Sequence, residues 1–183
     1  MKKVIYCLGD SNTWGFDPRS PFGDPYDKAW PELLGEQTGA EIFKDGLNGR
    51  SLRDCVQSYD LLKRSLTRGD PDLLILLLGS NDIHMEDLTD PAVVAGRMDA
   101  LLKRIRADFR DLPLFLLSPP EIRIPGPYRD TVKALGGHYH SLSQQFSAGF
   151  LNLAELPLPL CYDGVHLTED GHRLLAGILK QSL

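Results

Sequence analysis

Three residues far apart in the chain have the types that nucleophilic acyl transfer needs. Ser11 follows a short apolar run in the stretch Gly-Asp-Ser, and Asp163 and His166 stand three residues apart near the other end. A serine hydroxyl becomes a nucleophile when a neighbouring imidazole removes its proton, and a carboxylate orients that imidazole and stabilises its cation. In a turn that leads into a helix, this spacing lets the carboxylate meet one ring nitrogen while the other points toward Ser11. The pattern predicts a nucleophile, a base and an orienting acid.

The oxyanion that develops in such a reaction needs fixed hydrogen-bond donors. The candidates are the backbone N–H of Ser11, the side-chain amide of Asn81, and the backbone N–H of Gly46, where the missing side chain permits close approach. Gly49, in the same glycine-rich stretch, is the alternative to Gly46. The sequence therefore predicts an oxyanion hole that three separate segments build together.

Short apolar segments precede these residues and predict the strands that position them. The clearest is 73–78, which contains only Leu and Ile and is therefore apolar on both faces, as in a covered parallel sheet. The other expected strands are 4–8, 114–117, 150–153 and, more weakly, 41–44. Apolar residues at helical spacing predict helices at 30–37, 51–66, 91–109, 128–146 and 169–181. This alternation predicts one α/β domain, 1–183, with a mostly parallel sheet in three layers.

The carboxyl ends of parallel strands share one edge of a sheet, and ligands bind at that edge. Ser11, Gly46 and Asn81 each come shortly after an expected strand, and the Asp-x-x-His pair follows the last one. The turns therefore predict a single site at that edge. The segment 17–28 is rich in Pro, Gly and Asp, and we expect it to be a loop that lies over another part of the molecule.

The composition excludes several classes of partner. Of the 183 residues, 42% are hydrophobic and 25% are charged, and the net charge of −5 comes without a basic stripe. This balance argues against nucleic acid or an anionic membrane surface as the primary partner. Three cysteines without a C-x-x-C spacing favour a reducing compartment. The first apolar run is shorter than the roughly 7–15 residues of a secretory leader, and no run approaches the ~20 residues of a membrane span. We therefore expect a cytoplasmic protein.

Several of these residues also have a plain structural interpretation. Gly-Asp-Ser is common turn chemistry, and Asp10 is expected to brace that turn through backbone hydrogen bonds. Trp14 is either a core residue or a wall of the substrate site, and His84 is expected near the rim of the pocket. Together with Asp10, both are candidate substrate-binding residues. Remote alternatives are a metal-dependent phosphoesterase, for which only His166 is well placed, and a non-catalytic binding module. No metal site and no cofactor are predicted.

Four blocks of residues, in this order and spacing, resemble the SGNH (GDSL-like) hydrolase superfamily. The blocks are Gly9-Asp10-Ser11, Gly46, Gly79-x-Asn81-Asp82 and Asp163-x-x-His166. The stretches Gly-Asp-Ser-x-Thr-Trp-Gly, Ser-Pro-Pro and Asp-Gly-Val-His-Leu-Thr resemble its arylesterase and acyltransferase branch. Two positions depart from the superfamily pattern, since Asn12 stands in place of a Leu and Lys44 stands where the second block often has an Asn.

The resemblance implies a flavodoxin-like fold, with a five-stranded parallel sheet of order 2-1-3-4-5 and helices on both faces. It implies Ser11 as nucleophile, His166 as base, Asp163 as its partner, and Gly46 and Asn81 as oxyanion donors. The implied function is that of a serine esterase that cleaves small carboxylic esters through an acyl-enzyme, with acyltransfer when an alcohol replaces water. A carbohydrate O-deacetylase of the same fold is the alternative, and the branch suggests a homo-oligomer.

Overall fold

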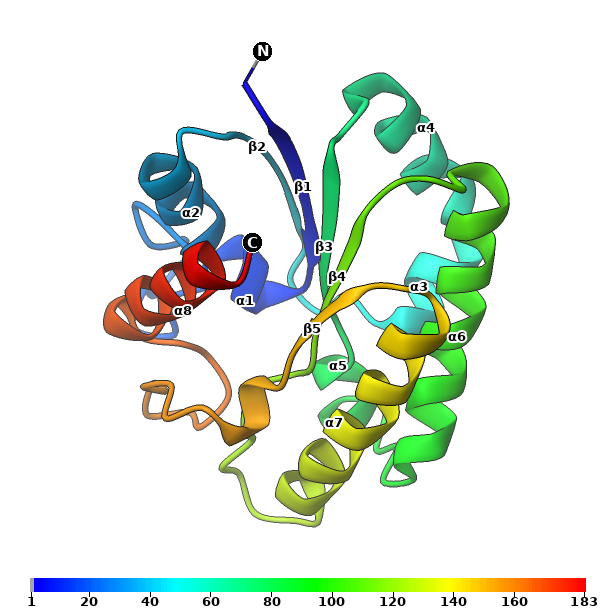
Figure 1. Cartoon of the computed structure of the whole chain (residues 1–183). Coiled ribbons are helices and arrows are strands. Elements are labelled where there is room, and N and C mark those ends of the chain that lie inside the picture. The colour runs from blue at the N-terminus through cyan, green and yellow to red at the C-terminus, as the bar shows by residue number, and fades with distance from the viewer. Residues whose placement is uncertain (1) are drawn as a thin grey trace.

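Five parallel strands form one sheet in the order β2-β1-β3-β4-β5, and helices cover both of its faces (Figure 1). The computed structural model describes residues 2–183. The strands are β1 (Val4–Gly9), β2 (Glu41–Gly46), β3 (Leu73–Leu77), β4 (Leu114–Leu117) and β5 (Gly149–Leu151). The structure confirms the predicted α/β fold and strand order.

The helices follow the strands in the alternation that the sequence predicts. They are α1 (Ser11–Trp14), α2 (Trp30–Thr38), α3 (Leu52–Gln57), α4 (Tyr59–Gly69), α5 (Ser80–His84), α6 (Pro91–Asp108), α7 (Tyr128–Gln145), the 3₁₀ turn η1 (Leu153–Glu155) and α8 (Glu169–Ser182). Helices α2 and α8 pack on one face of the sheet, and α3, α4, α6 and α7 pack on the other (Figure 1). No helix among residues 2–183 is long and apolar enough to cross a lipid bilayer.

The alternation of side chains along β1 shows how the two hydrophobic cores form. Ile5 and Cys7 point toward α2 and α8, whereas Tyr6 and Leu8 point toward the helices of the other face. All five residues of β3 are buried, as expected for a strand covered on both sides. Both strands therefore end rigidly at the same edge of the sheet, and the segments that carry the polar motifs begin there.

Two elements differ from the expectation, and a third contains a glycine that the structure explains. The helix expected over 51–66 is broken at Ser58 into α3 and α4. The strand expected over 150–153 is β5, which ends earlier and passes into η1. Helix α7 runs without a break through Gly136, as predicted, and a side chain at that position would overlap the side chain of Asn152. This close approach, and not a helix end, explains why glycine stands there.

Candidate active site

The nucleophile turn begins where β1 ends. Asp10 caps the short helix α1, and its Oδ1 accepts a hydrogen bond from the backbone N–H of Asn12 at 2.9 Å. Ser11 is the first residue of that helix and is 7% exposed. A Cβ on Gly9 would overlap the side chain of Thr13, so only glycine lets the helix turn back so tightly. Burial raises the pKa of Asp10 to about 6, although the hydrogen bond from the N–H of Asn12 opposes this.

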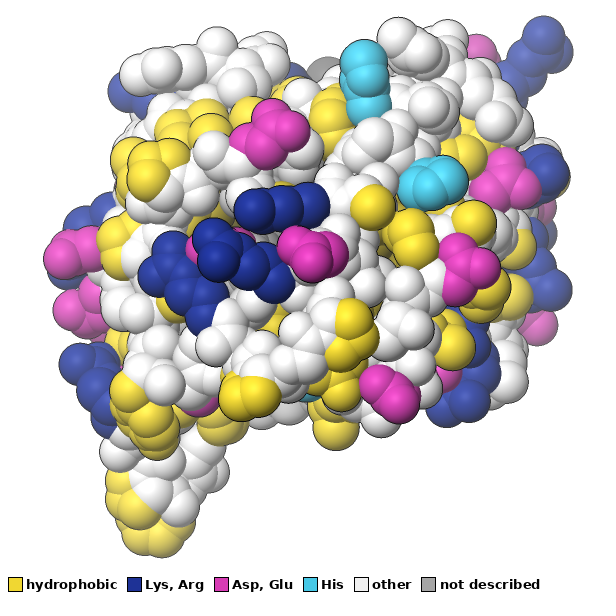
Figure 2. Space-filling view, turned by 90° about the horizontal axis from the view of Figure 1, so that it is seen from below, with side chains coloured by type: hydrophobic (Ala, Val, Ile, Leu, Met, Phe, Trp, Pro, Cys, Tyr) yellow, Lys and Arg dark blue, Asp and Glu magenta, His cyan; other side chains and the backbone are white. Residues whose placement is uncertain are grey.

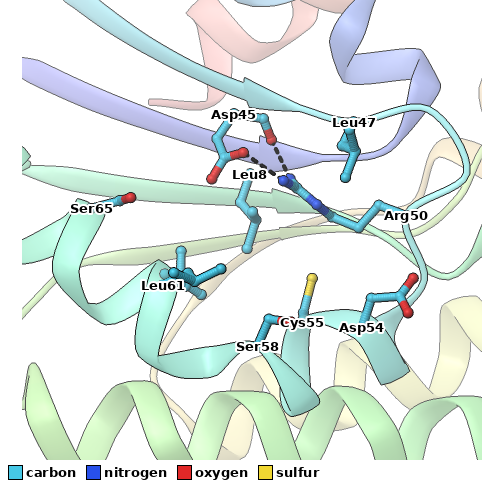
Figure 3. Close-up of a pocket in the computed structure, with 10 residues that line it drawn as sticks. Leu8, Asp45, Leu47, Arg50, Asp54, Cys55, Ser58, Leu61 and Ser65 are labelled. Carbon is cyan, nitrogen blue, oxygen red and sulfur yellow. Dashed lines mark hydrogen bonds and ion pairs between the residues drawn. The ribbon is translucent and has the colours of Figure 1, made fainter.

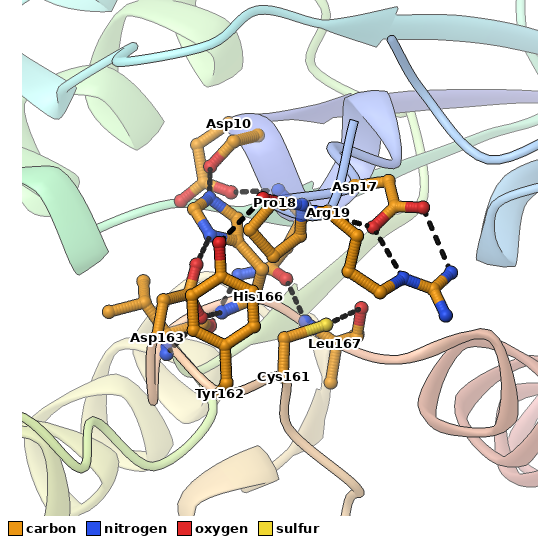
Figure 4. A network of polar contacts seen from close by, with 12 residues as sticks. Asp10, Asp17, Pro18, Arg19, Cys161, Tyr162, Asp163, His166 and Leu167 are labelled. Atoms are coloured by element: carbon orange, nitrogen blue, oxygen red, sulfur yellow. Dashed lines mark hydrogen bonds and ion pairs between the residues drawn. The ribbon is translucent and has the colours of Figure 1, made fainter. Parts of the chain in front are cut away.

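Ser11, His166 and Asp163 form one line of hydrogen bonds, and Figure 4 shows Asp163 and His166 within the polar network of the site. The Nε2 atom of His166 lies 2.9 Å from the hydroxyl of Ser11, and its Nδ1 atom lies 2.5 Å from Oδ2 of Asp163. The other carboxylate oxygen of Asp163 accepts from the backbone N–H groups of Val165 and His166, at 3.0 and 3.1 Å. Burial alone would raise the pKa of Asp163, but these hydrogen bonds outweigh it and hold the pKa below its ordinary value. The carboxylate therefore stays charged beside the imidazole.

A tight turn and an aromatic ring fix the position of His166. Gly164 adopts a φ of +72°, and its C=O accepts from the backbone N–H of Arg123 at 2.8 Å. The backbone N–H of Cys161 donates to the C=O of His166 at 2.7 Å, which closes the turn. The ring of Phe16 packs against the imidazole, with 4.6 Å between the ring centroids. No sequence pattern indicated a role for Phe16, because its partner is far away in the chain.

Asn81 lies on α5, directly after β3, and is 3% exposed. Its Nδ2 donates one hydrogen bond to the C=O of Arg50 at 2.9 Å. An amide nitrogen carries two protons, so a second one is available to a substrate. Asp82, the next residue, anchors α5 through hydrogen bonds from the backbone N–H of Leu52 at 2.8 Å and from Arg97 at 2.6 Å. These bonds hold the Asn81 amide in place.

Gly46 and Gly49 have different surroundings. Gly46 is the last residue of β2, in register with Gly9, and the next N–H along the chain, that of Leu47, donates to the C=O of Gly9. Because alternate N–H groups of a strand point to opposite sides, the N–H of Gly46 is directed away from β1. A Cβ on Gly46 would overlap the backbone of Trp14, so its glycine serves close packing. Gly49 lies in the following turn at a φ of +76°, with open space around it.

Arg50 connects this turn to the sheet. Its Nη1 donates to the C=O groups of Gly9 and Asp45 at 3.0 and 2.6 Å, and its Nη2 lies 2.6 Å from Oδ1 of Asp45. The same side chain borders a cavity of about 310 Å³ between β2 and the helices α3 and α4 (Figure 3). Arg50 therefore joins the carboxyl ends of β1 and β2, while its own C=O holds Asn81.

Trp14 and His84, the other two candidate substrate-binding residues, contact groups outside the triad. The ring of Trp14 faces Lys44, whose Nζ lies 5.4 Å from the ring centroid and donates to the C=O of Trp14 at 3.3 Å. His84 is half-buried, with its Nδ1 2.7 Å from the C=O of Ser80. Burial lowers the pKa of His84, and the nearby His166 acts in the same direction. Neither residue hydrogen-bonds to the triad within residues 2–183.

The face of the molecule at the carboxyl ends of the strands carries both charged and hydrophobic side chains (Figure 2). Figure 2 shows it with acidic, basic and histidine side chains set among hydrophobic ones. Within the described part of the chain, no group of three or more His, Cys, Asp or Glu side chains is arranged to hold a metal ion.

One family model matches most of the chain. Residues 7–174 match the sequence profile described as the GDSL-like lipase/acylhydrolase family. The chain belongs to this family. It is accordingly a carboxylic ester hydrolase, and its substrates are small-molecule esters. No curated protein matches the chain.

Solved structures with the same fold carry esterase titles. A carbohydrate acetylesterase family member from Sinorhizobium meliloti has a TM-score of 0.83 at 22% identity, over 98% of this chain and 96% of that one. An aryl esterase from M. smegmatis has a TM-score of 0.81 at 24% identity, over 98% and 97% of the two chains. A structure titled a putative arylesterase, from Agrobacterium tumefaciens, has a TM-score of 0.82 at 24% identity, with 98% and 97% covered. At these identities the likeness establishes the fold.

Proposed function

We propose that the protein is a serine esterase in which Ser11 is the nucleophile, His166 the base and Asp163 its orienting acid. The observation that carries this proposal is the line of hydrogen bonds from the Ser11 hydroxyl through both ring nitrogens of His166 to Asp163. Each group has the partner that its role requires, because the hydroxyl faces a ring nitrogen and the carboxylate faces the other.

In the first half of the reaction, Ser11 Oγ attacks the ester carbonyl while its proton passes to Nε2 of His166. The resulting imidazolium is stabilised by the carboxylate of Asp163, which accepts from Nδ1–H. His166 then gives the proton to the leaving alkoxide, and the acyl group remains on Ser11. In the second half, His166 takes a proton from the water that attacks the acyl group and returns it to Ser11 Oγ as the carboxylic acid leaves. An alcohol in place of water gives acyltransfer.

The negative charge on the carbonyl oxygen needs donors that are already in position. Asn81 supplies the amide proton that is not bound to Arg50. Ser11, as the first residue of α1, has a backbone N–H with no acceptor inside that helix. For the third donor we propose Gly49 in place of Gly46, because the turn at Gly49 is open whereas the N–H of Gly46 is directed away from β1.

The acyl group is proposed to be small, such as acetyl. Support comes from the solved structures of the same fold, whose titles name carbohydrate acetylesterase and aryl esterase proteins. An O-acetylated sugar is therefore the second candidate substrate beside an aryl ester. A series of aryl esters from acetate to octanoate, run beside acetylated sugars, separates these choices. A steady rise in kcat/KM with chain length would contradict a small acyl site.

The substitution Ser11→Ala tests the assignment of the nucleophile. We expect it to abolish turnover of a short aryl ester, since no other hydroxyl takes part in the hydrogen-bonded line. Thermal unfolding of the variant should match that of the native protein, because the change removes one oxygen atom at a helix start. Retention of full activity by Ser11→Ala would remove the basis of the proposal.

The cell compartment and the assembly are also proposed. All three cysteines, Cys7, Cys55 and Cys161, are free thiols, which supports a location in the reducing cytoplasm. A homo-oligomer is proposed from the resemblance to the acyltransferase branch. Light scattering of the purified protein gives its mass directly, and a monomer at all concentrations would contradict this assembly.

A further inference from the structure

The side chain of Asn12 bridges the nucleophile turn and the segment that carries the base. Its Nδ2 donates to the C=O of Val165 at 3.3 Å, and its Oδ1 accepts from the backbone N–H of Leu167 at 2.9 Å. The side chain is 1% exposed, and its partners are more than 150 residues away in the chain. These partners are the two residues on either side of His166.

This arrangement fixes the backbone of the base relative to the backbone of the nucleophile. Asn12 directly follows Ser11, and its own N–H is held by Asp10. Apart from the contact between Ser11 and His166 themselves, no other residue of α1 hydrogen-bonds to residues 161–167 in the described chain. The other hydrogen bonds of this segment run within it, to Arg123, and to the loop after α1, where Tyr162 donates to the C=O of Pro18 at 2.7 Å. Asn12 is therefore the side chain that joins the residues beside His166 to the residue beside Ser11.

The amide group suits this place because it offers a donor and an acceptor together. A leucine of similar size would leave the C=O of Val165 and the N–H of Leu167 buried without partners, which is costly. An aspartate would keep the acceptor for Leu167 but would set a carboxylate oxygen against the C=O of Val165. Only asparagine satisfies both groups in this geometry.

We propose that Asn12 is a positioning residue that aligns His166 with Ser11 through the backbone on both sides of the imidazole. The proposal rests on the proposed function, since it takes Ser11 as nucleophile and His166 as base. A nucleophile and base misplaced by about 1 Å lose about 10²-fold in rate. Loss of the bridge should therefore lower the chemical step while substrate binding stays as it is.

The test compares Asn12→Leu and Asn12→Asp with the native protein. We expect kcat for a short aryl acetate to fall about 10- to 100-fold in both variants, with KM changed by less than about twofold. The second-order rate of labelling by a fluorophosphonate should fall by the same factor as kcat, because that reaction uses the same nucleophile and base. If Asn12→Leu does not fold, the more conservative Asn12→Asp carries the test.

A matched control separates positioning from general stability. Asn152→Ala removes a side-chain hydrogen bond of similar kind, the 2.7 Å bond to the hydroxyl of Ser118, which has no contact with the triad. This variant should lose thermal stability as the Asn12 variants do, but keep its kcat. Folded Asn12 variants with native kcat and labelling rate, or an equal loss of kcat in Asn152→Ala, would overturn the proposal. Full activity of Ser11→Ala would instead overturn the proposed function itself, so the two failures are distinct.

Discussion

His172 is a buried histidine whose ionisation should oppose folding in acid. It lies on α8, is 1% exposed, and its Nδ1 accepts from the backbone N–H of Trp30 at 3.3 Å. Its Nε2 is buried without a partner among residues 2–183, and its ring packs edge-on against Tyr26. Burial lowers the pKa of His172 to about 3, and the positive charge of Lys44 acts in the same direction.

The size of the effect follows from the two pKa values. An unfolded chain has a histidine pKa of about 6.5, so between that value and 3 the unfolded state of the protein binds a proton that the folded state does not. The free energy of unfolding therefore falls as the pH falls through this range. Between pH 7 and pH 5 the loss from His172 alone is about 2 kcal/mol. This stabilisation is fully present at pH values above the pKa of the histidine in the unfolded chain.

Urea unfolding of the native protein and of His172→Gln at pH 7 and pH 5 measures this loss. Glutamine keeps an acceptor for Trp30 but does not titrate, so the variant should lose about 2 kcal/mol less than the native protein over this interval. Asp10 acts in the opposite sense, since its pKa is raised to about 6 and its ionisation lowers stability as the pH rises. That contribution is the same in both proteins and cancels in the comparison.

The exposed His138 provides the matched control. His138→Gln should show the same loss of stability between pH 7 and pH 5 as the native protein. Equal losses in the native protein and in His172→Gln would refute the reasoning, because they would mean that His172 binds its proton in the folded state.

Three further substitutions test the positioning of the site. Asn81→Ala should lower kcat about 10²- to 10³-fold at nearly unchanged KM, as steady-state kinetics would show, and a pure KM effect would contradict its role. Arg97→Met leaves the fully buried Asp82 without its cation and should cost about 3 kcal/mol in urea unfolding at neutral pH. Because burial raises the pKa of Asp82, this cost should fall as the pH is lowered and the carboxyl takes up its proton, and a pH-independent cost would contradict this. Gly46→Ala should lower the melting temperature, because its Cβ would overlap the backbone of Trp14; an unchanged value would contradict that packing.

Much of the fold could be predicted because its signals are local. The Leu and Ile run before Gly79 predicts a strand buried on both faces, and the chain places it at the centre of the sheet. The break at Ser58 could not be predicted, because the apolar spacing continues on both sides of it and both helices face the same core. The reason for a glycine at position 136 of α7 could not be predicted either, because it lies in a distant side chain, that of Asn152.

The site shows the same division between local and distant signals. Ser11, His166 and Asp163 could be proposed as nucleophile, base and acid from the sequence. Each has the side chain that its role requires, and each follows an expected strand. The sequence could not distinguish Gly46 from Gly49, because the difference lies in the direction of an N–H group in an edge strand. The role proposed for Asn12 was also hidden, as both of its partners are backbone groups more than 150 residues away.

The most direct test of the central claim is to locate the covalent adduct formed with a fluorophosphonate probe. The native protein, treated with the probe and digested, should carry one adduct, on the peptide that contains Ser11. The probe should not label Ser11→Ala. It should label His166→Ala much more slowly than the native protein. Labelling of a different residue in the native protein, together with unchanged labelling of Ser11→Ala, would contradict the account.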